Sequence, residues 1–190
     1  MDYLLPELLS SKHEKEEIRL IETDRLLIRP YTTEDMHFLE SLVSDPQVVR
    51  FIGNGRPRTK EGARLFFNWN LSHMKADQQF GLQVLVEKVS GESIGHAGLV
   101  PQEVDGVTEL EVGYWIAPAF WGKGFASEAA AAFRDIALEQ LNKNRIIALI
   151  YPDNIASCRV AEKLGMHVWK RIERHNKPVL VYLKEKTPPN

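Results

Sequence analysis

The sequence is poor in the residues that build disulfides and metal clusters. It contains a single cysteine, Cys158, and six histidines, among which no HExxH or HxH spacing occurs. One cysteine cannot close an intrachain disulfide or supply a thiolate zinc cluster. We therefore expect no disulfide framework and no metal site.

Long apolar runs and an excess of charge of one sign are also missing. No stretch approaches the roughly 18 uncharged apolar residues of a membrane span, and residues 1–17 lack the basic and apolar segments of a secretion signal. The 24 Lys and Arg residues and 26 Asp and Glu residues give a formal net charge of −2, and no basic block is present to neutralise nucleic-acid phosphates. We expect a cytoplasmic protein whose partners include neither a membrane nor a nucleic acid.

The composition is that of an ordinary globular protein. The 190 residues are 44% hydrophobic and 26% charged, and at about 150 residues per domain this length predicts one domain. We place the domain at residues 18–184, after a helical or flexible arm at 1–17 and before a tail at 185–190. The sequence leaves open whether the protein is a monomer or a homodimer.

Hydrophobic periodicity predicts alternating groups of strands and helices. The expected order is one strand, two helices, an antiparallel three-stranded meander, a long helix, a strand, a short helix and a closing pair of strands. This order is typical of a mixed α/β (α+β) fold whose helices cover a central sheet. The main predicted strands are 25–30, 80–89, 94–100, 110–116, 145–151, 168–172 and 179–183, and the later helices are 59–74, 126–141 and 155–164.

A glycine turn opens the longest predicted helix. Pro118 ends a strand, and Gly122 and Gly124 precede an alanine-rich helix. Glycine permits backbone conformations in which successive amides point at one anion, and the first turn of a helix leaves its own amides unpaired. A diphosphate would fit there, although a turn that binds nothing is the alternative. The spacing is neither a Walker loop nor a Rossmann fingerprint.

Two ordered motifs give the chain a specific family resemblance. The segment GYWIAPAFWGKGFASEA (113–129) resembles the coenzyme A motif of the GNAT superfamily of N-acetyltransferases, and NIASCRVAEKLGM (154–166) resembles the helix motif that follows it. The start, ETDRLLIRP (22–30), is similar to the RimJ/RimL-like branch, which acetylates the N-terminal amines of ribosomal proteins. The resemblance covers about residues 18–183. It departs from the family at Trp121, where Gln or Arg is usual, and at Ala161, where Tyr is usual.

The resemblance implies a mostly antiparallel central sheet with helices on both faces and a splayed pair of parallel strands. Acetyl-CoA would lie in the gap between the strands that end at Ile116 and Tyr151, and its acetyl group would pass by direct attack of an amine on the thioester. The acceptor would be a protein N-terminus or a small amine such as an antibiotic or a polyamine. The residues implied in cofactor binding are Trp115, Ile116, Ala117, Trp121, Gly122, Lys123, Gly124, Phe125, Ala126 and Asn154.

Two catalytic side chains are expected if the chain resembles this family in its mechanism. Strand alternation places Glu109 and Glu111 on the same face as Trp115, and we favour Glu111 as the base or the carboxylate of a water relay. The alternative is that both carboxylates only face solvent. The N-terminal-amine branch carries a serine three positions after the asparagine, which makes Ser157 the expected proton donor to the leaving thiolate.

The tyrosine missing at Ala161 keeps a second function open. A chain that binds acyl-CoA as a sensor, without catalysis, would share both motifs. A globular domain whose glycine turn is only a loop is the third alternative. The residues do not identify the acceptor, although the family builds that site from the helix pair before Phe80 and from the closing hairpin at 175–178.

Overall fold

The computed structural model describes residues 20–76 and 80–187, and its strands form one eight-stranded sheet in the order β1-β2-β3-β4-β5-β6-β8-β7. The predicted arm at 1–17 lies outside the described residues. All neighbouring strands are antiparallel except β5 and β6, which are parallel. The strands are β1 (Ile21–Glu22), β2 (Leu26–Arg29), β3 (Gly81–Glu87), β4 (Ser93–Val104), β5 (Val107–Ile116), β6 (Arg145–Ile150), β7 (His167–Arg174) and β8 (Lys177–Glu185).

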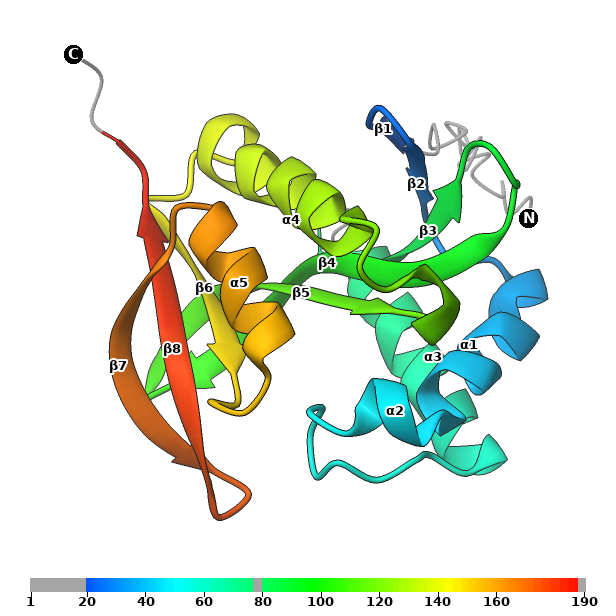
Figure 1. The fold of residues 1–190 in the computed structure, drawn as a ribbon, viewed down its shortest axis with the longest axis horizontal. Helices are drawn as coiled ribbons and strands as arrows, with labels where there is room; N and C mark the ends of the chain where they lie inside the picture. The colour runs from blue at the N-terminus through cyan, green and yellow to red at the C-terminus, as the bar shows by residue number, and fades with distance from the viewer. Residues whose placement is uncertain (1–19, 77–79, 188–190) are drawn as a thin grey trace, which may run out of the picture.

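Helices cover both faces of the sheet. Figure 1 shows α4 and α5 in front of the sheet and α3 behind β4 and β5. The longer helices are α1 (Met36–Ser44), α3 (Lys60–Ala76), α4 (Phe125–Asp135) and α5 (Ile155–Lys163), and the shorter ones are η1 (Thr33–Asp35), α2 (Pro46–Val49), η2 (Pro118–Phe120) and the π-helical turn η3 (Ile136–Gln140). The expected mixed α/β fold, with a mostly antiparallel sheet and one parallel pair, is confirmed.

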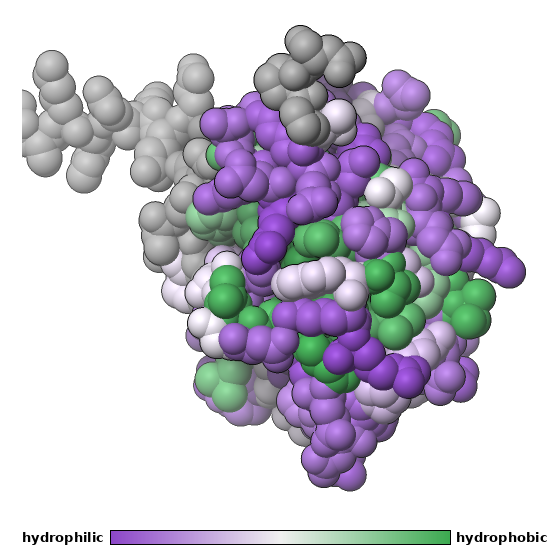
Figure 2. Space-filling view, turned by 90° about the vertical axis from the view of Figure 1, so that its left-hand side faces the viewer, coloured by the Kyte–Doolittle hydropathy of each residue, from purple (hydrophilic) through white to green (hydrophobic). Residues whose placement is uncertain are grey.

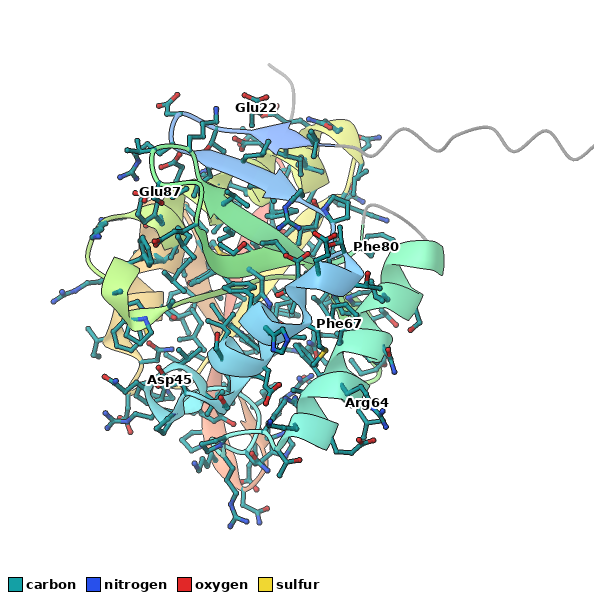
Figure 3. The ribbon with its side chains drawn as sticks, turned by 90° about the vertical axis from the view of Figure 1, so that its right-hand side faces the viewer. Glu22, Asp45, Arg64, Phe67, Phe80 and Glu87 are labelled. Carbon is teal, nitrogen blue, oxygen red and sulfur yellow. The ribbon has the colours of Figure 1, made fainter. Side chains whose placement is uncertain are left out.

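Each helix layer has its own apolar core. On the α4 side, Phe125, Ala129 and Phe133 pack with the inward-facing side chains of β4 and β5. On the other side, Phe67 of α3 and Leu39 of α1 pack with the strands beneath them, and Figure 3 shows Phe67 between these two helices. This two-sided packing fixes which β5 side chains face α4 and which face α3.

Most differences from the predicted elements have a local cause. The sequence Ser44-Asp45-Pro46 ends α1 as expected, but Pro46 then begins the short helix α2, because the Asp45 carboxylate accepts a hydrogen bond from the Gln47 amide at 2.8 Å. The predicted helix at 126–141 ends as an α-helix at Asp135 and continues as η3. At the other end of the chain, β8 reaches Glu185, one residue into the predicted tail.

Strands β5 and β6 separate soon after they meet. Their recorded register is the single pair Glu111 and Ile147, whereas β4 and β5 are paired along their whole length. The two strand ends therefore leave a gap in the sheet, as the family resemblance implies. Helix α4 begins just after β5, so its first turn lies beside this gap.

One edge of the sheet is strand β7, and the other is β1. Figure 2 faces this side of the molecule, where hydrophilic side chains surround smaller apolar areas. Exposed apolar side chains of β7 include Val168 and Trp169, and the Lys170 ammonium lies 4.0 Å from the centre of the Trp169 ring. Charged side chains on an edge strand disfavour pairing with further strands. Within the described ranges, no helix has the length and apolar character of a bilayer span.

Candidate active site

The glycine turn has the geometry of an anion-binding loop. Gly122 and Gly124 have φ values of +75° and +86°, and Gly124 is the N-cap of α4. The first intrahelical bond runs from the Glu128 amide to the Gly124 carbonyl at 3.1 Å. The amides of the preceding three helical residues therefore have no intrahelical acceptor, and they lie at the positive end of the helix dipole. These amides are the groups that the sequence analysis predicts to bind a diphosphate.

Arg25 holds this turn from the start of β2. Its guanidinium donates to the Lys123 carbonyl at 2.8 Å and to the Glu128 carboxylate at 2.7 Å, and it lies 4.6 Å from the centre of the Phe125 ring. Partial burial would raise the pKa of Glu128, but hydrogen bonds from Thr23 and Arg25 lower it below its ordinary value. Sequence reasoning did not single out Arg25, because its partners lie about a hundred residues away along the chain.

Replacing Arg25 with glutamine is expected to loosen the turn. The variant loses the bonds to Lys123 and Glu128, so we expect weaker CoA binding by several-fold and a free energy of unfolding lower by about 1 kcal/mol, because the pair is partly exposed. Calorimetric titration with CoA and urea unfolding measure both effects. The control is Arg64→Gln, which breaks only an exposed pair with Glu61. Equal CoA affinity in both variants would contradict a positioning role for Arg25.

The end of β5 offers backbone groups to the gap. The Ala117 amide donates to the Ile94 carbonyl of β4 at 2.8 Å. Since bonding alternates along an antiparallel pair, the backbone groups of Trp115 also face β4, whereas those of Tyr114 and Ile116 face the gap. The Ile116 carbonyl accepts a bond from the Trp121 indole at 2.7 Å, so Trp121 ties the glycine turn to the strand end. The Ile116 amide and the Tyr114 backbone remain to pair with an extended ligand.

Asn154 and Ser157 lie at the start of α5, across the gap from β5. The Asn154 side chain caps the helix by accepting from the Ser157 amide at 3.3 Å. The Tyr114 hydroxyl crosses the gap to donate to the Ser157 carbonyl at 3.2 Å. Burial raises the pKa of Tyr114 well above its ordinary value, so the phenol stays protonated. Tyr114 is thus a second hydroxyl beside Ser157 that the sequence reasoning missed.

A cavity of about 250 Å³ lies on the opposite face of the gap. Its walls come from the loop after α2, helix α3, strands β3 to β6 and the β7–β8 hairpin. Helix α3 and the hairpin belong to the segments that the family resemblance assigns to the acceptor. Both strands of the splayed pair contribute, with Glu111 and Trp115 from β5 and Leu149 from β6. The cavity therefore reaches the gap from the face opposite α4 and α5.

Glu111 is the acidic side chain among the described residues that line this cavity. One carboxylate oxygen accepts a hydrogen bond from the Leu149 amide at 3.3 Å, just where β5 and β6 separate. Burial raises the pKa of Glu111 to about 7, although the Leu149 amide and the nearby Arg174 guanidinium act against this rise. A group with this pKa exchanges protons readily at neutral pH.

Two neighbouring titratable groups are engaged with other residues. Glu109, predicted to lie on the same strand face, is buried and held by both arms of the Arg145 guanidinium. His96 is fully buried, its Nδ1 lies 2.7 Å from the Tyr31 hydroxyl, and burial lowers its pKa to about 3. Among the described residues, no cluster of His, Cys, Asp or Glu could hold a metal ion. The geometry therefore favours Glu111 over Glu109 as the proton acceptor.

Comparison with known proteins identifies the family of this chain. Residues 25–167 match the family described as an acetyltransferase (GNAT) domain. The chain is 38% identical over 161 residues to the uncharacterized protein YkkB of Bacillus subtilis (strain 168). The aligned region covers 84% of this chain and 92% of YkkB. A GNAT family acetyltransferase from Bacillus anthracis has the same fold, with a TM-score of 0.74, 27% identity and coverage of 88% and 99%.

The chain therefore belongs to the GNAT acetyltransferase family, and it is an acyltransferase. A more distant neighbour is RimL, a ribosomal alpha-N-protein acetyltransferase in complex with coenzyme A, with a TM-score of 0.73, 16% identity and coverage of 88% and 98%. At that identity the likeness extends to the fold alone. The family uses acetyl-CoA as its acetyl donor, and the acceptor of this chain is not given by the match.

Proposed function

We propose that this protein transfers an acetyl group from acetyl-CoA to a primary amine that enters the Glu111 cavity. The observation that supports this most directly is the position of Glu111. Its carboxylate lies where β5 and β6 part, and the glycine turn lies beside the same gap. A donor bound on one face of the sheet and an acceptor bound on the other would meet there.

The residues of the glycine turn and of the strand end fit a CoA ligand. The amides of Gly122 to Ala126 would hold the diphosphate, and Lys123 would add a positive charge. The backbone groups of Tyr114 and Ile116 would pair with the extended arm from one side, and Asn154 would hold it from the other. When bound, acetyl-CoA supplies the activated acetyl thioester.

The side chains then account for two proton transfers. With a pKa of about 7, Glu111 is largely ionised at slightly alkaline pH and takes the proton of the attacking amine, directly or through water. Ser157 returns a proton to the thiolate of CoA. Tyr114 is the alternative donor, because its hydroxyl lies beside Ser157 and is hydrogen-bonded to the Ser157 carbonyl. The thiol of CoA leaves readily as a thiolate, so loss of either hydroxyl need not abolish turnover.

The chemistry of the acceptor site bears on the branch of the family to which this chain belongs. We favour a RimJ/RimL-like enzyme of the cytoplasm that acts on an α-amine, because an α-amine has a pKa of about 7.7–8.0 and is partly neutral without help, whereas a lysine side chain near 10.4 needs a stronger base. Glu111 with a pKa of about 7 is matched to the α-amine. A small molecule or a peptide could present this group.

Acetyl transfer can be tested by following thiol release from acetyl-CoA. The panel contains amino acids, peptides with free N-termini, lysine derivatives blocked at the α-amine, and polyamines. We expect release with α-amines and an N-acetylated product of matching mass, with much slower release from lysine side chains. Tight CoA binding with no release from any amine would instead favour the non-catalytic acyl-CoA sensor.

A further inference from the structure

Arg58 borders the entrance of the Glu111 cavity. It lies between α2 and α3, lines the cavity, and also lines a second, shallower hollow with Leu65, Phe66 and Trp69. Its guanidinium carbon lies 4.7 Å from the centre of the Phe66 ring. The guanidinium therefore lies over the Phe66 ring, and both residues line the two hollows.

Arg58 has no acidic partner in the described part of the chain. Ion pairs are present for Arg29 with Asp35, Arg64 with Glu61 and Arg145 with Glu109, but none joins Arg58 to a carboxylate. Partial burial lowers the pKa of Arg58, with no neighbouring negative charge to offset it. An exposed guanidinium that lines the cavity and has no counterion is available to bind a carboxylate in two-pronged geometry.

The other charges around the cavity add to the positive potential. Of the charged side chains that line it in the described structure, Arg58 and Arg174 are positive and Glu111 is negative. Arg174 already donates to the Gln102 side chain at 2.9 Å. Lys177 adds a positive charge 5.7 Å from the ring of Tyr151, which lines the cavity. An acceptor with several positive charges would be repelled here, whereas one with an anionic group would be attracted.

Aromatic rings connect Arg58 with the strand end. Trp69 and Phe66 stack with their centres 5.6 Å apart, and Phe66 and Trp115 stack at 5.4 Å. The ring planes are nearly parallel, at 13° and 12°. Phe66 and Trp115 thus form a continuous aromatic stack from the arginine to β5, and both line the cavity, where the apolar body of a small ligand can pack against them.

We propose that the acceptor is a small primary amine that also carries a carboxylate, with the carboxylate on Arg58 and the amine at Glu111. Amino acids and short peptides share this chemistry. The cavity of about 250 Å³ lies below the usual range for drug-sized ligands, which agrees with a small molecule or the end of a short chain. This inference rests on the proposed function, because that function places the reacting amine in the Glu111 cavity.

Binding of reaction products tests this inference without relying on turnover. Calorimetric titrations of the CoA-saturated protein use N-acetylated alanine, leucine, phenylalanine and glutamate, each as the free acid and with its α-carboxylate as the amide. We expect at least one acid to bind roughly tenfold more tightly than its amide. Arg58→Gln should abolish this preference, whereas the neighbouring Arg56→Gln should retain it, because Arg56 does not line the cavity. N-acetylated dipeptides in the same format distinguish a peptide from a free amino acid.

The outcomes separate this inference from the proposed function. Equal binding of every acid and its amide, or no binding of any of them, overturns the role of Arg58 in the wild-type protein. A carboxylate preference that survives in an Arg58→Gln variant shown by circular dichroism to be folded overturns this role as well. Faster acetylation of spermine than of any amino acid also overturns it. A carboxylate preference that depends on Arg58, without thiol release from any amine, supports carboxylate binding at Arg58 but defeats acetyl transfer, and with it the role of the bound molecule as an acceptor.

Discussion

Glu111→Gln is expected to lower the turnover number by about a hundredfold or more, which is the usual contribution of a general base. Glutamine is nearly isosteric with glutamate, and its carbonyl oxygen can still accept the Leu149 amide. The loss therefore isolates the proton transfer from the packing. Steady-state thiol release with a saturating acceptor measures the effect, and CoA affinity from calorimetry should be unchanged.

The pH dependence gives this prediction a second readout. The pKa of about 7 means that Glu111 is protonated and inactive below that pH and ionised above it. Because the free amine must also lose a proton, the logarithm of kcat/KM of the wild type should fall with a slope of two below about pH 7, and that of Glu111→Gln with a slope of one. Identical profiles for the two proteins would remove Glu111 from the base role.

Between pH 4.5 and 7, the free energy of unfolding should fall with rising pH, whereas kcat/KM should rise. Burial raises the folded-state pKa of Glu111 above its unfolded value near 4.5, so the unfolded state binds fewer protons than the folded state between those two values. The free energy of unfolding of the wild type therefore falls as pH rises through this window, and Glu111→Gln lacks this decrease.

Glu109→Gln is the matched control for the effect of Glu111→Gln on turnover. It breaks the buried contact with Arg145, so it should lower the thermal midpoint while retaining turnover.

Gly122→Asp is expected to weaken CoA binding roughly tenfold or more relative to Gly122→Asn, a difference of about 1.4 kcal/mol. The added carboxylate would lie among amides that otherwise receive the diphosphate. A Cβ at Gly122 meets no atom within 4 Å, whereas one at Gly124 would lie 3.4 Å from the Arg25 guanidinium, which could neutralise a new charge. Gly122 is therefore the cleaner position for this test.

The pair of variants separates charge from backbone strain. Asp and Asn are nearly isosteric, and both tolerate a positive φ better than other residues with a side chain. Calorimetric titration with CoA at low and high salt measures the difference, which should shrink as salt screens the added charge. Equal affinities of the two variants at low salt would contradict diphosphate binding by this turn.

The glycine turn and the strand that carries Glu111 could be predicted because their signals are local. Gly122 and Gly124 are needed for backbone conformations of their own residues, and strand alternation alone puts Glu111 on the face of Trp115. The same local reasoning predicted the helix at 155–164, which is observed as α5 with Leu164 as its C-cap, followed by Gly165 at a φ of +74°. It missed α2, because the stop signal at Pro46 is also a start signal for a new helix.

The sequence by itself determined most of the order of the elements, the family, the position of the glycine turn and the strand that carries Glu111. Each of these follows from residues close together in the chain. The tertiary structure decided that Arg25 holds the turn, that Arg58 borders the Glu111 cavity, and that the pKa of Glu111 lies near 7. These properties depend on desolvation and on charges brought together from segments distant in the chain, and no local pattern of residues specifies them.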